Sequence, residues 1–76
     1  MEEVKRTYYD DEVLKEEWFE INGKKEGYYK RYYSNGQIWC ICFYIDDNKN
    51  GEYKSYDEYG DLIKQSIYEN GKKLKM

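Results

Sequence analysis

The sequence predicts an all-β protein, an antiparallel meander of six or seven strands built from three hairpin repeats of 24 residues. The first observation behind this prediction is internal repetition. Residues 51–62 read GEYKSYDEYGDL, residues 27–38 read GYYKRYYSNGQI, and residues 3–14 read EVKRTYYDDEVL, all in one ungapped register. A period of this length is typical of a repeat architecture. The chain is therefore expected to form a single domain, residues 1–76, with repeats at approximately 3–26, 27–50 and 51–74.

The second observation is that β-favouring residues fall between short turn signals, with no helical period of useful length. The expected strands are residues 3–9, 13–21, 27–33, 37–45, 51–57 and 61–69, and residues 72–76 are expected to add a short lysine-rich edge strand. Residues 37–45, QIWCICFYI, form the most apolar stretch. We expect it at the centre of the sheet, because a meander gives this strand a neighbour on each side.

The third observation concerns the turns. Asn22-Gly23 and Asn70-Gly71 are strong signals for two-residue hairpin turns, and Asp46-Asp47 stands in their place in the middle repeat. The alternate connections, Ser34-Asn35-Gly36 and Glu58-Tyr59-Gly60, suit three-residue loops whose last residue is left-handed. Positive φ is therefore predicted at both of these loop glycines.

The first repeat departs from this turn pattern. Asp10-Asp11-Glu12 occupies the place of the glycine-containing loops. Glutamate resists the left-handed conformation, so this loop is expected to be the loosest of the three.

The consensus positions do not all fall on one side of a regular strand. Ile38 and Phe43 are five residues apart, and Tyr29 and Tyr32 are three apart, so each pair would point to opposite faces. Either each repeat carries a β-bulge or both faces are partly apolar. We expect a strongly twisted sheet that curls over its own concave side. A single layer of this size leaves an apolar face incompletely covered, which predicts a homodimer or a tight obligate complex.

Composition argues against several classes of function. The chain of 76 residues has a net charge of −3, and its 20% aromatic content, including 11 Tyr, is too high for a disordered tail. It has no His, the usual acid/base group at neutral pH, and no phosphate-cradling glycine loop. We therefore expect no enzyme, no cofactor and no metal ion. The net negative charge argues against duplex DNA, and the scattered lysines argue against a membrane surface.

The two cysteines, Cys40 and Cys42, would share one face of a strand. Their i, i+2 spacing does not easily reach disulfide geometry, and two thiols are too few for a closed zinc site. Buried free thiols are the expectation, with redox or metal duty as the alternative. No apolar run reaches ten residues, so neither a signal peptide nor a membrane-spanning helix is expected. Together these features predict a cytoplasmic protein.

The repeat unit resembles the MORN repeat, especially its bacterial, antitoxin-like variant. The third copy carries Gly51, Tyr53, Tyr56, Gly60 and Leu62 at the family's spacing, and the second copy carries Gly27, Tyr29, Tyr32, Gly36 and Ile38 at the matching positions. The first copy has Glu3, Lys5 and Glu12 instead of Gly, aromatic and Gly, as in a degenerate cap. The resemblance implies a scaffold or binding module without catalytic residues. Some relatives are linked to membranes and phosphoinositides, and the bacterial variant to toxin neutralisation.

Aromatic residues present in only one repeat are candidates for partner binding. Trp39 aligns with Lys15 and Ile63, and Trp18 aligns with Cys42 and Ser66. Trp, Tyr and Arg are enriched at interface hot spots. The predicted partner-binding residues are Trp39, Trp18, Tyr28, Arg31, Tyr33 and Lys30. A core role is the alternative, because Trp18 could cover Gly27 and Trp39 lies in the most apolar strand. The second choice is an acidic strip of Asp10, Asp11, Glu12, Glu16, Glu17 and Glu20.

The function predicted from these features is that of a small inhibitor, an antitoxin or immunity-like module that binds a toxin or a nuclease-like effector. One alternative is a phage-encoded inhibitor of a bacterial defence nuclease, such as an anti-CRISPR protein. A further alternative is binding of single-stranded RNA or DNA by residues 28–33, YYKRYY, which interleave stacking rings with cations.

Overall fold

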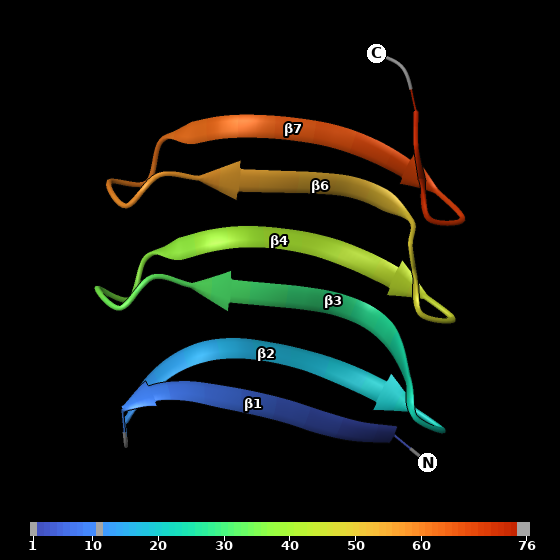
Figure 1. Ribbon diagram of the computed structural model, residues 1–76, viewed down its shortest axis with the longest axis horizontal. Helices are drawn as coiled ribbons and strands as arrows, with labels where there is room; N and C mark the ends of the chain where they lie inside the picture. Colours follow the sequence, from blue (N-terminus) through green and yellow to red (C-terminus); the bar gives the residue numbers. More distant parts are fainter. Residues whose placement is uncertain (1, 11, 75–76) are drawn as a thin grey trace.

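The computed structural model describes residues 2–10 and 12–74, which form one antiparallel sheet with its strands in chain order (Figure 1). The strands are β1 (Glu2–Asp10), β2 (Val13–Ile21), β3 (Lys24–Tyr32), β4 (Ile38–Ile45), β5 (Asn48–Lys49), β6 (Gly51–Tyr56), β7 (Leu62–Glu69) and β8 (Lys72–Lys73). The short β5 pairs with the end of β4, and the short β8 with the end of β7. The all-β meander predicted from the repeats is confirmed, as is the lysine-rich edge strand at residues 72–73.

The two-residue turns lie at one end of the strands, and the three-residue loops lie at the other end (Figure 1). We refer to these two sides, where the chain reverses, as the turn edge and the loop edge of the sheet. Gly36 and Gly60 have φ of 90° and 95°, as predicted. In the loop of the second repeat, the N–H of Gly36 donates to the carbonyl of Tyr33, and the N–H of Tyr33 donates to the carbonyl of Gln37. This pattern is that of a β-turn followed by a left-handed glycine. The corresponding loop of the first repeat includes residue 11, which lies outside the described residues.

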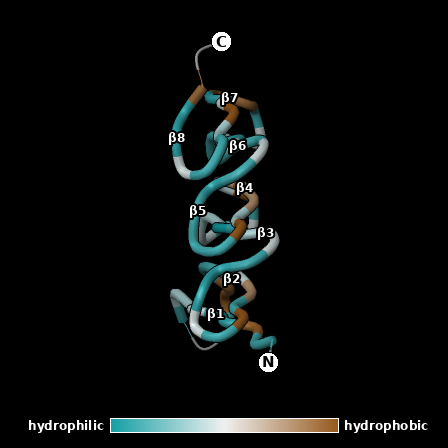
Figure 2. The backbone as a smooth tube through the Cα atoms, turned by 90° about the vertical axis from the view of Figure 1, so that its right-hand side faces the viewer, coloured by the Kyte–Doolittle hydropathy of each residue, from teal (hydrophilic) through white to brown (hydrophobic). Residues whose placement is uncertain are grey.

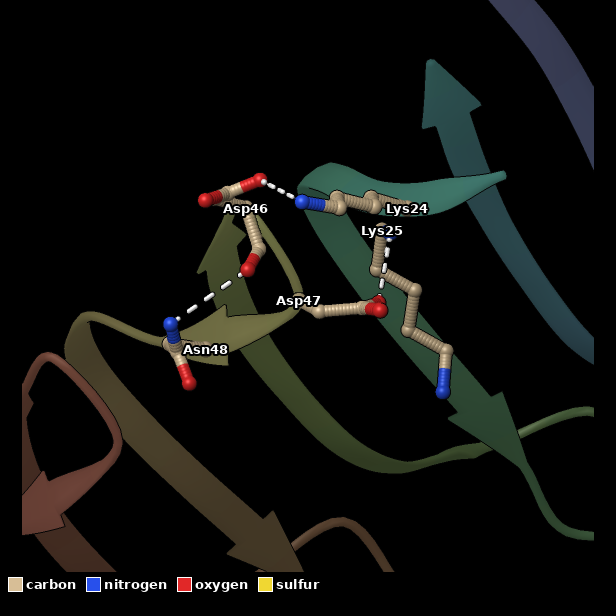
Figure 3. A network of polar contacts seen from close by, with 5 residues as sticks. All are labelled: Lys24, Lys25, Asp46, Asp47 and Asn48. Carbon is tan, nitrogen blue, oxygen red and sulfur yellow. Dashed lines mark hydrogen bonds and ion pairs between the residues drawn. The ribbon is translucent and has the colours of Figure 1, made fainter. Parts of the chain in front are cut away.

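The turn at Asp46 and Asp47 is left-handed at both residues, with φ of 53° and 72°. The neighbouring repeat supports this turn through polar contacts (Figure 3). The Lys24 ammonium lies 3.1 Å from Asp46 Oδ1, and the backbone N–H of Lys25 donates to Asp47 Oδ1 at 2.8 Å. The turn therefore keeps the hairpin geometry of its Asn-Gly counterparts, although it contains no glycine. Seen from this edge, the three turns lie one above another and are mostly hydrophilic (Figure 2).

Each repeat carries a β-bulge, one of the two explanations that the sequence left open. Arg31 pairs with Cys40 and Tyr32 pairs with Ile38, so Trp39 is the extra residue. The same shift occurs beside Tyr8 and beside Tyr56. Because of the bulge, Ile38 and Phe43 lie on one face of β4 although they are five residues apart. Tyr29 and Tyr32 lie on opposite faces of β3, so both faces also carry aromatic rings.

Gly27 and Gly51 have φ of 96° and 92°, a conformation that side chains rarely adopt. They bend the chain after the two-residue turns that precede them, so residues 24–26 and 48–50 run from one hairpin to the next past the ends of the neighbouring strands (Figure 1). A Cβ atom at Gly27 would lie 3.8 Å from Cδ2 of Phe19. Phe19 is therefore the residue beside Gly27, in place of the Trp18 cover considered from the sequence.

The sheet is a thin, open layer, with principal extents of 34 × 33 × 11 Å. The expectation of a sheet curled over its own concave side is wrong, because a layer 11 Å thick cannot enclose a core. Among the residues that the structure describes, the buried ones are Cys40, Cys42, Ser55 and Ser66. The cysteines are free thiols, as predicted. Strand pairing and side-chain packing on each face therefore replace the usual two-layer core.

Tyrosine hydroxyls link one repeat to the next. Tyr9 Oη donates to the carbonyl of Tyr32, and Tyr33 Oη donates to the carbonyl of Tyr56, both at 2.7 Å. At the opposite edge, the N–H of Asp47 donates to the carbonyl of Lys25. Each repeat is thus attached to its neighbour at both edges of the sheet as well as along the paired strands.

Candidate protein-binding surface

The strand register separates the side chains into two faces, because directly paired residues point to the same side of a sheet. Trp18 pairs with Tyr29, Tyr29 with Cys42, and Tyr53 with Ser66. Tyr44 and Tyr68 follow two residues after Cys42 and Ser66 on the same strands. We call this side the tyrosine face, and its rings are those of Trp18, Tyr29, Tyr44, Tyr53 and Tyr68. The opposite side, which carries Tyr28, Lys30 and Phe43, is called the outer face.

Two lysines stand over the rings of the tyrosine face. The Nζ atom of Lys25 lies 5.5, 5.5 and 5.3 Å from the ring centroids of Trp18, Tyr29 and Tyr44. The Nζ atom of Lys49 lies 5.0 Å from the centroids of both Tyr53 and Tyr68. These distances are within cation–π range. We call the two clusters the lysine cages.

Sequence reasoning did not identify the lysine cages. The signal was present, because Lys25 with Tyr29 and Tyr44 recurs in the next repeat as Lys49 with Tyr53 and Tyr68. The lysines precede the consensus glycines, however, and the tyrosines lie on different strands. Only the strand register shows that these residues meet.

Three of the predicted partner-binding residues lie together on the tyrosine face. The rings of Tyr33 and Trp39 are stacked, with centroids 5.1 Å apart and planes at 15°. Cζ of Arg31 lies 4.3 Å from the centroid of the Trp39 ring. The bulge at Trp39 turns the indole toward the side of Arg31, which is why these residues meet. We call Arg31, Tyr33 and Trp39 the arginine stack.

Glu16 on β2 pairs with Arg31 on β3, but its carboxylate accepts hydrogen bonds from two hydroxyl groups. Tyr29 Oη donates to one oxygen of Glu16, and Thr7 Oγ1 donates to the other at 2.9 Å. The hydrogen bond from Tyr29 is the main cause that lowers the pKa of Glu16. Burial, followed by this same bond, raises the pKa of the Tyr29 hydroxyl. Glu16 is therefore a structural acceptor on the tyrosine face.

The remaining predicted partner-binding residues are divided between the faces. Trp18 is on the tyrosine face, in the first lysine cage, and its indole N–H donates to Glu20 at 2.8 Å. Tyr28 and Lys30 are on the outer face, where Tyr28 is 54% exposed and forms a T-shaped pair with Phe43, with ring centroids 5.0 Å apart. The six residues thus form no single surface, because neighbouring residues of β3 alternate between faces.

The predicted acidic strip is also divided. Glu16 and Glu20 belong to the tyrosine face, whereas Glu17 lies on the outer face and forms a 2.8 Å ion pair with Arg6. Asp10 and Glu12 are exposed beside the first loop, and Asp11 lies outside the described residues. The strip therefore offers no continuous acidic surface on either face.

The buried thiols are not poised for reaction. Burial raises the pKa of Cys40, and it raises the pKa of Cys42 to about 11. Both thiols are therefore protonated at neutral pH, and the thiolate is the reactive form. In residues 2–10 and 12–74, no group of three or more His, Cys, Asp or Glu residues could hold a metal ion. The described part of the chain likewise contains no helix suited to crossing a membrane.

An open repeat sheet with two uncovered faces defines a repeat-based binding module. Residues 25–46 and 49–70, more than half of the chain, match the MORN repeat variant, and the chain belongs to this family. The first repeat lies almost entirely outside the matched segments, consistent with its loss of the consensus glycines. No curated protein and no solved structure matches the chain.

Proposed function

We propose that this MORN-variant chain is a protein-binding inhibitor of the antitoxin or immunity type, and that it binds its partner with the tyrosine face. The observation that carries this proposal is the arginine stack. Arg31, Tyr33 and Trp39 belong to the residue types that dominate interface hot spots, and here they pack against one another at an uncovered surface.

The size of the face supports the same conclusion. A standard protein interface takes about 800 Å² from each partner. A sheet of 34 × 33 Å offers a surface of that order on one side. The strands and inter-repeat bonds hold the side chains in fixed positions, which lowers the entropic cost of binding.

The test is affinity capture from the native host with the purified chain as bait, followed by an activity assay of the captured protein. A matched bait, Trp39→Ala, controls for non-specific capture, provided that its melting curve agrees with the unsubstituted chain. We expect a toxin or nuclease that only the unsubstituted bait retains and whose activity the chain suppresses. Equal recovery with both baits, or no suppression of activity, would contradict the proposal.

The captured enzyme also separates the two versions of the proposal. Capture of a toxin whose gene lies next to the gene for this chain supports the antitoxin or immunity version. Capture of a defence nuclease, with phage genes beside the gene for this chain, supports the phage-inhibitor version.

A further inference from the structure

Four cations of the described residues are ion-paired, and these pairs are Lys5–Glu3, Arg6–Glu17, Lys24–Asp46 and Lys54–Glu52. Lys25, Arg31 and Lys49 form no ion pair with any carboxylate of the described segments, 2–10 and 12–74. Each of these three cations stands over an aromatic ring of the tyrosine face. In the first repeat, Lys15 likewise stands over the ring of Tyr9.

Three carboxylates of the same face already have hydrogen-bond or ion-pair partners within the chain. Glu3 pairs with Lys5, Glu16 accepts from Tyr29 and Thr7, and Glu20 accepts from Trp18. The Nε atom of Arg31 is buried and has no acceptor among the described residues. Lys64 and Lys73 add positive charge to this face, since they pair with Ser55 and Tyr68. Glu3, Glu16 and Glu20 keep their negative charge, but six cations share this face by the strand register: Lys5, Lys25, Arg31, Lys49, Lys64 and Lys73. These cations outnumber the three carboxylates, although the chain as a whole carries −3.

The three cations lie within reach of one extended polypeptide segment. Arg31 on β3 is opposite Cys40, and Lys49 on β5 is opposite Tyr44. These two cations are therefore about 13 Å apart along β4 and about 10 Å apart across it, because β3 and β5 flank β4 on opposite sides. Side chains at i and i+4 of an extended peptide are separated by about 13 Å on one side, and the long side chains of both partners span the remaining offset. Lys25 and Lys49 are one repeat apart, two strand spacings or about 10 Å. Carboxylates at alternate positions of a segment lying on this face could reach all three cations.

The rings favour a polypeptide over a single-stranded nucleic acid. Base stacking needs free ring faces. Here the ammonium groups of Lys25 and Lys49 stand over the rings of the lysine cages, and the Trp39 ring is stacked on Tyr33 and Arg31. Residues 28–33, the nucleic-acid candidate of the sequence, also alternate between the two faces.

We propose that the tyrosine face receives an acidic polypeptide segment, whose Asp or Glu carboxylates bind the Arg31 guanidinium and the Lys25 and Lys49 ammonium groups. This rests on the proposed protein-binding function and specifies the chemistry of the partner. The rings hold the cations in place without neutralising them. Arg31 offers a planar fork of donors that suits a carboxylate, and the ammonium groups act as point charges beside it.

The test uses fluorescence anisotropy with a labelled deca-glutamate peptide, a deca-glutamine peptide and a ten-nucleotide oligothymidine as probes. We expect saturable binding of deca-glutamate alone, weakening as salt rises because the contacts are between charges. Arg31→Gln and Lys25→Met should each weaken it by about tenfold or more. Lys54→Gln, which removes the same charge from the outer face, should change it less than twofold.

Several outcomes would overturn the inference. If the oligothymidine binds more tightly than deca-glutamate, the face is a nucleic-acid surface. If Lys54→Gln and Arg31→Gln lose equal affinity for deca-glutamate, the attraction is non-specific and the tyrosine face is not a binding site. If deca-glutamate does not bind, the partner is not an acidic segment and this inference is wrong. The proposed protein-binding function is tested separately, by whether capture of a host protein depends on Trp39. If Arg31→Gln fails to fold, Arg31→Lys serves in its place, with an expected partial loss because the charge is kept and the fork is removed.

Discussion

Lys25 and Asp47 exchange two hydrogen bonds between neighbouring repeats. The N–H of Lys25 donates to Asp47 Oδ1 at 2.8 Å (Figure 3). The N–H of Asp47 donates in return to the carbonyl of Lys25 at 3.0 Å. Asp47 makes both contacts from a left-handed conformation, φ 72°, where the other two-residue turns have glycine. The side chain of Asp47 thus offsets the conformational cost of its own backbone.

Asp47→Ala should therefore lower the free energy of unfolding by about 1–2 kcal/mol, because alanine keeps the left-handed strain and loses the acceptor. Asp47→Gly should stay within about 0.5 kcal/mol of the parent, since relief of strain offsets the lost bond. Urea denaturation measures both. Asp46→Asn, which removes only the exposed pair with Lys24, is the control and should cost less than about 1 kcal/mol. An alanine variant as stable as the parent would contradict this account.

Gly36→Val should lower the free energy of unfolding by about 1–2 kcal/mol. The residue has φ of 90°, which a β-branched side chain resists. Gly36→Asn is the matched control, because asparagine tolerates positive φ better, and it should cost less than valine. Thermal and urea denaturation give the comparison. Equal stability of the valine variant and the parent would mean that the loop rearranges at no cost.

Trp39→Ala should separate binding from stability. The indole packs on Tyr33 and Arg31 at an uncovered surface, so we expect a melting curve close to that of the parent. Binding to the captured partner should weaken by roughly thirtyfold or more, the usual effect of losing a hot-spot tryptophan. Titration calorimetry and thermal denaturation measure the two quantities.

Two consensus aromatics provide the comparison for Trp39. Phe43→Ala and Tyr32→Ala should each cost about 2 kcal/mol or more of stability, because these half-buried rings pack on the outer face. If Trp39→Ala unfolds the domain as well, the indole belongs to the folding core and the repeat-mismatch reasoning fails at Trp39.

Alkaline pH should destabilise the sheet. Burial raises the pKa of Cys42 from 9.0 to about 11 and that of Tyr44 from 10.0 to about 12. The folded state therefore holds these protons more tightly than the unfolded state. Their contribution to stability is complete below about pH 9 and is lost as pH rises toward 12. Urea midpoints should fall across this range, and Cys42→Ala should reduce the fall between pH 9 and 11. A midpoint independent of pH would contradict the burial of these groups.

Self-association remains a prediction of the open sheet. Both faces carry aromatic rings, and the layer is too thin to cover either of them. We expect a homodimer in the absence of a partner, because exposed apolar surface of this extent favours association. Light scattering at tens of micromolar measures the mass. A stable monomer at that concentration would show that the polar groups among the rings suffice to keep the faces in water.

The strands and turns could be predicted because their sequence patterns recur from repeat to repeat. Asn22-Gly23 and Asn70-Gly71 identify a turn by local chemistry, and the register then identifies Asp46-Asp47 as its counterpart. A bulge in each repeat was one of two explanations that the five-residue spacing of Ile38 and Phe43 left open. Local signals of this kind do not depend on how the sheet is shaped, which explains why they succeeded.

The shape of the sheet and the candidate site were less accessible. Curling was expected because a thin layer lacks a core, but bulges and inter-repeat bonds hold an open sheet without one. The alternation of β3 places Tyr28 and Arg31 on opposite faces, and the bulge then places Trp39 on the side of Arg31. The lysine cages join residues from separate strands, so their assembly required the register across the whole repeat.

The tyrosine hydroxyls that join successive repeats have a consequence for how the protein comes apart. Tyr9 and Tyr33 each donate a hydrogen bond to a carbonyl at the end of a strand in the following repeat. The third repeat has Asp57 at the equivalent position, and this side chain accepts hydrogen bonds from its own loop. Stability is then passed from neighbour to neighbour, as in a one-dimensional array of coupled units. Loss of order can start at an outer repeat and move inward one hairpin at a time, so the middle hairpin is expected to open last.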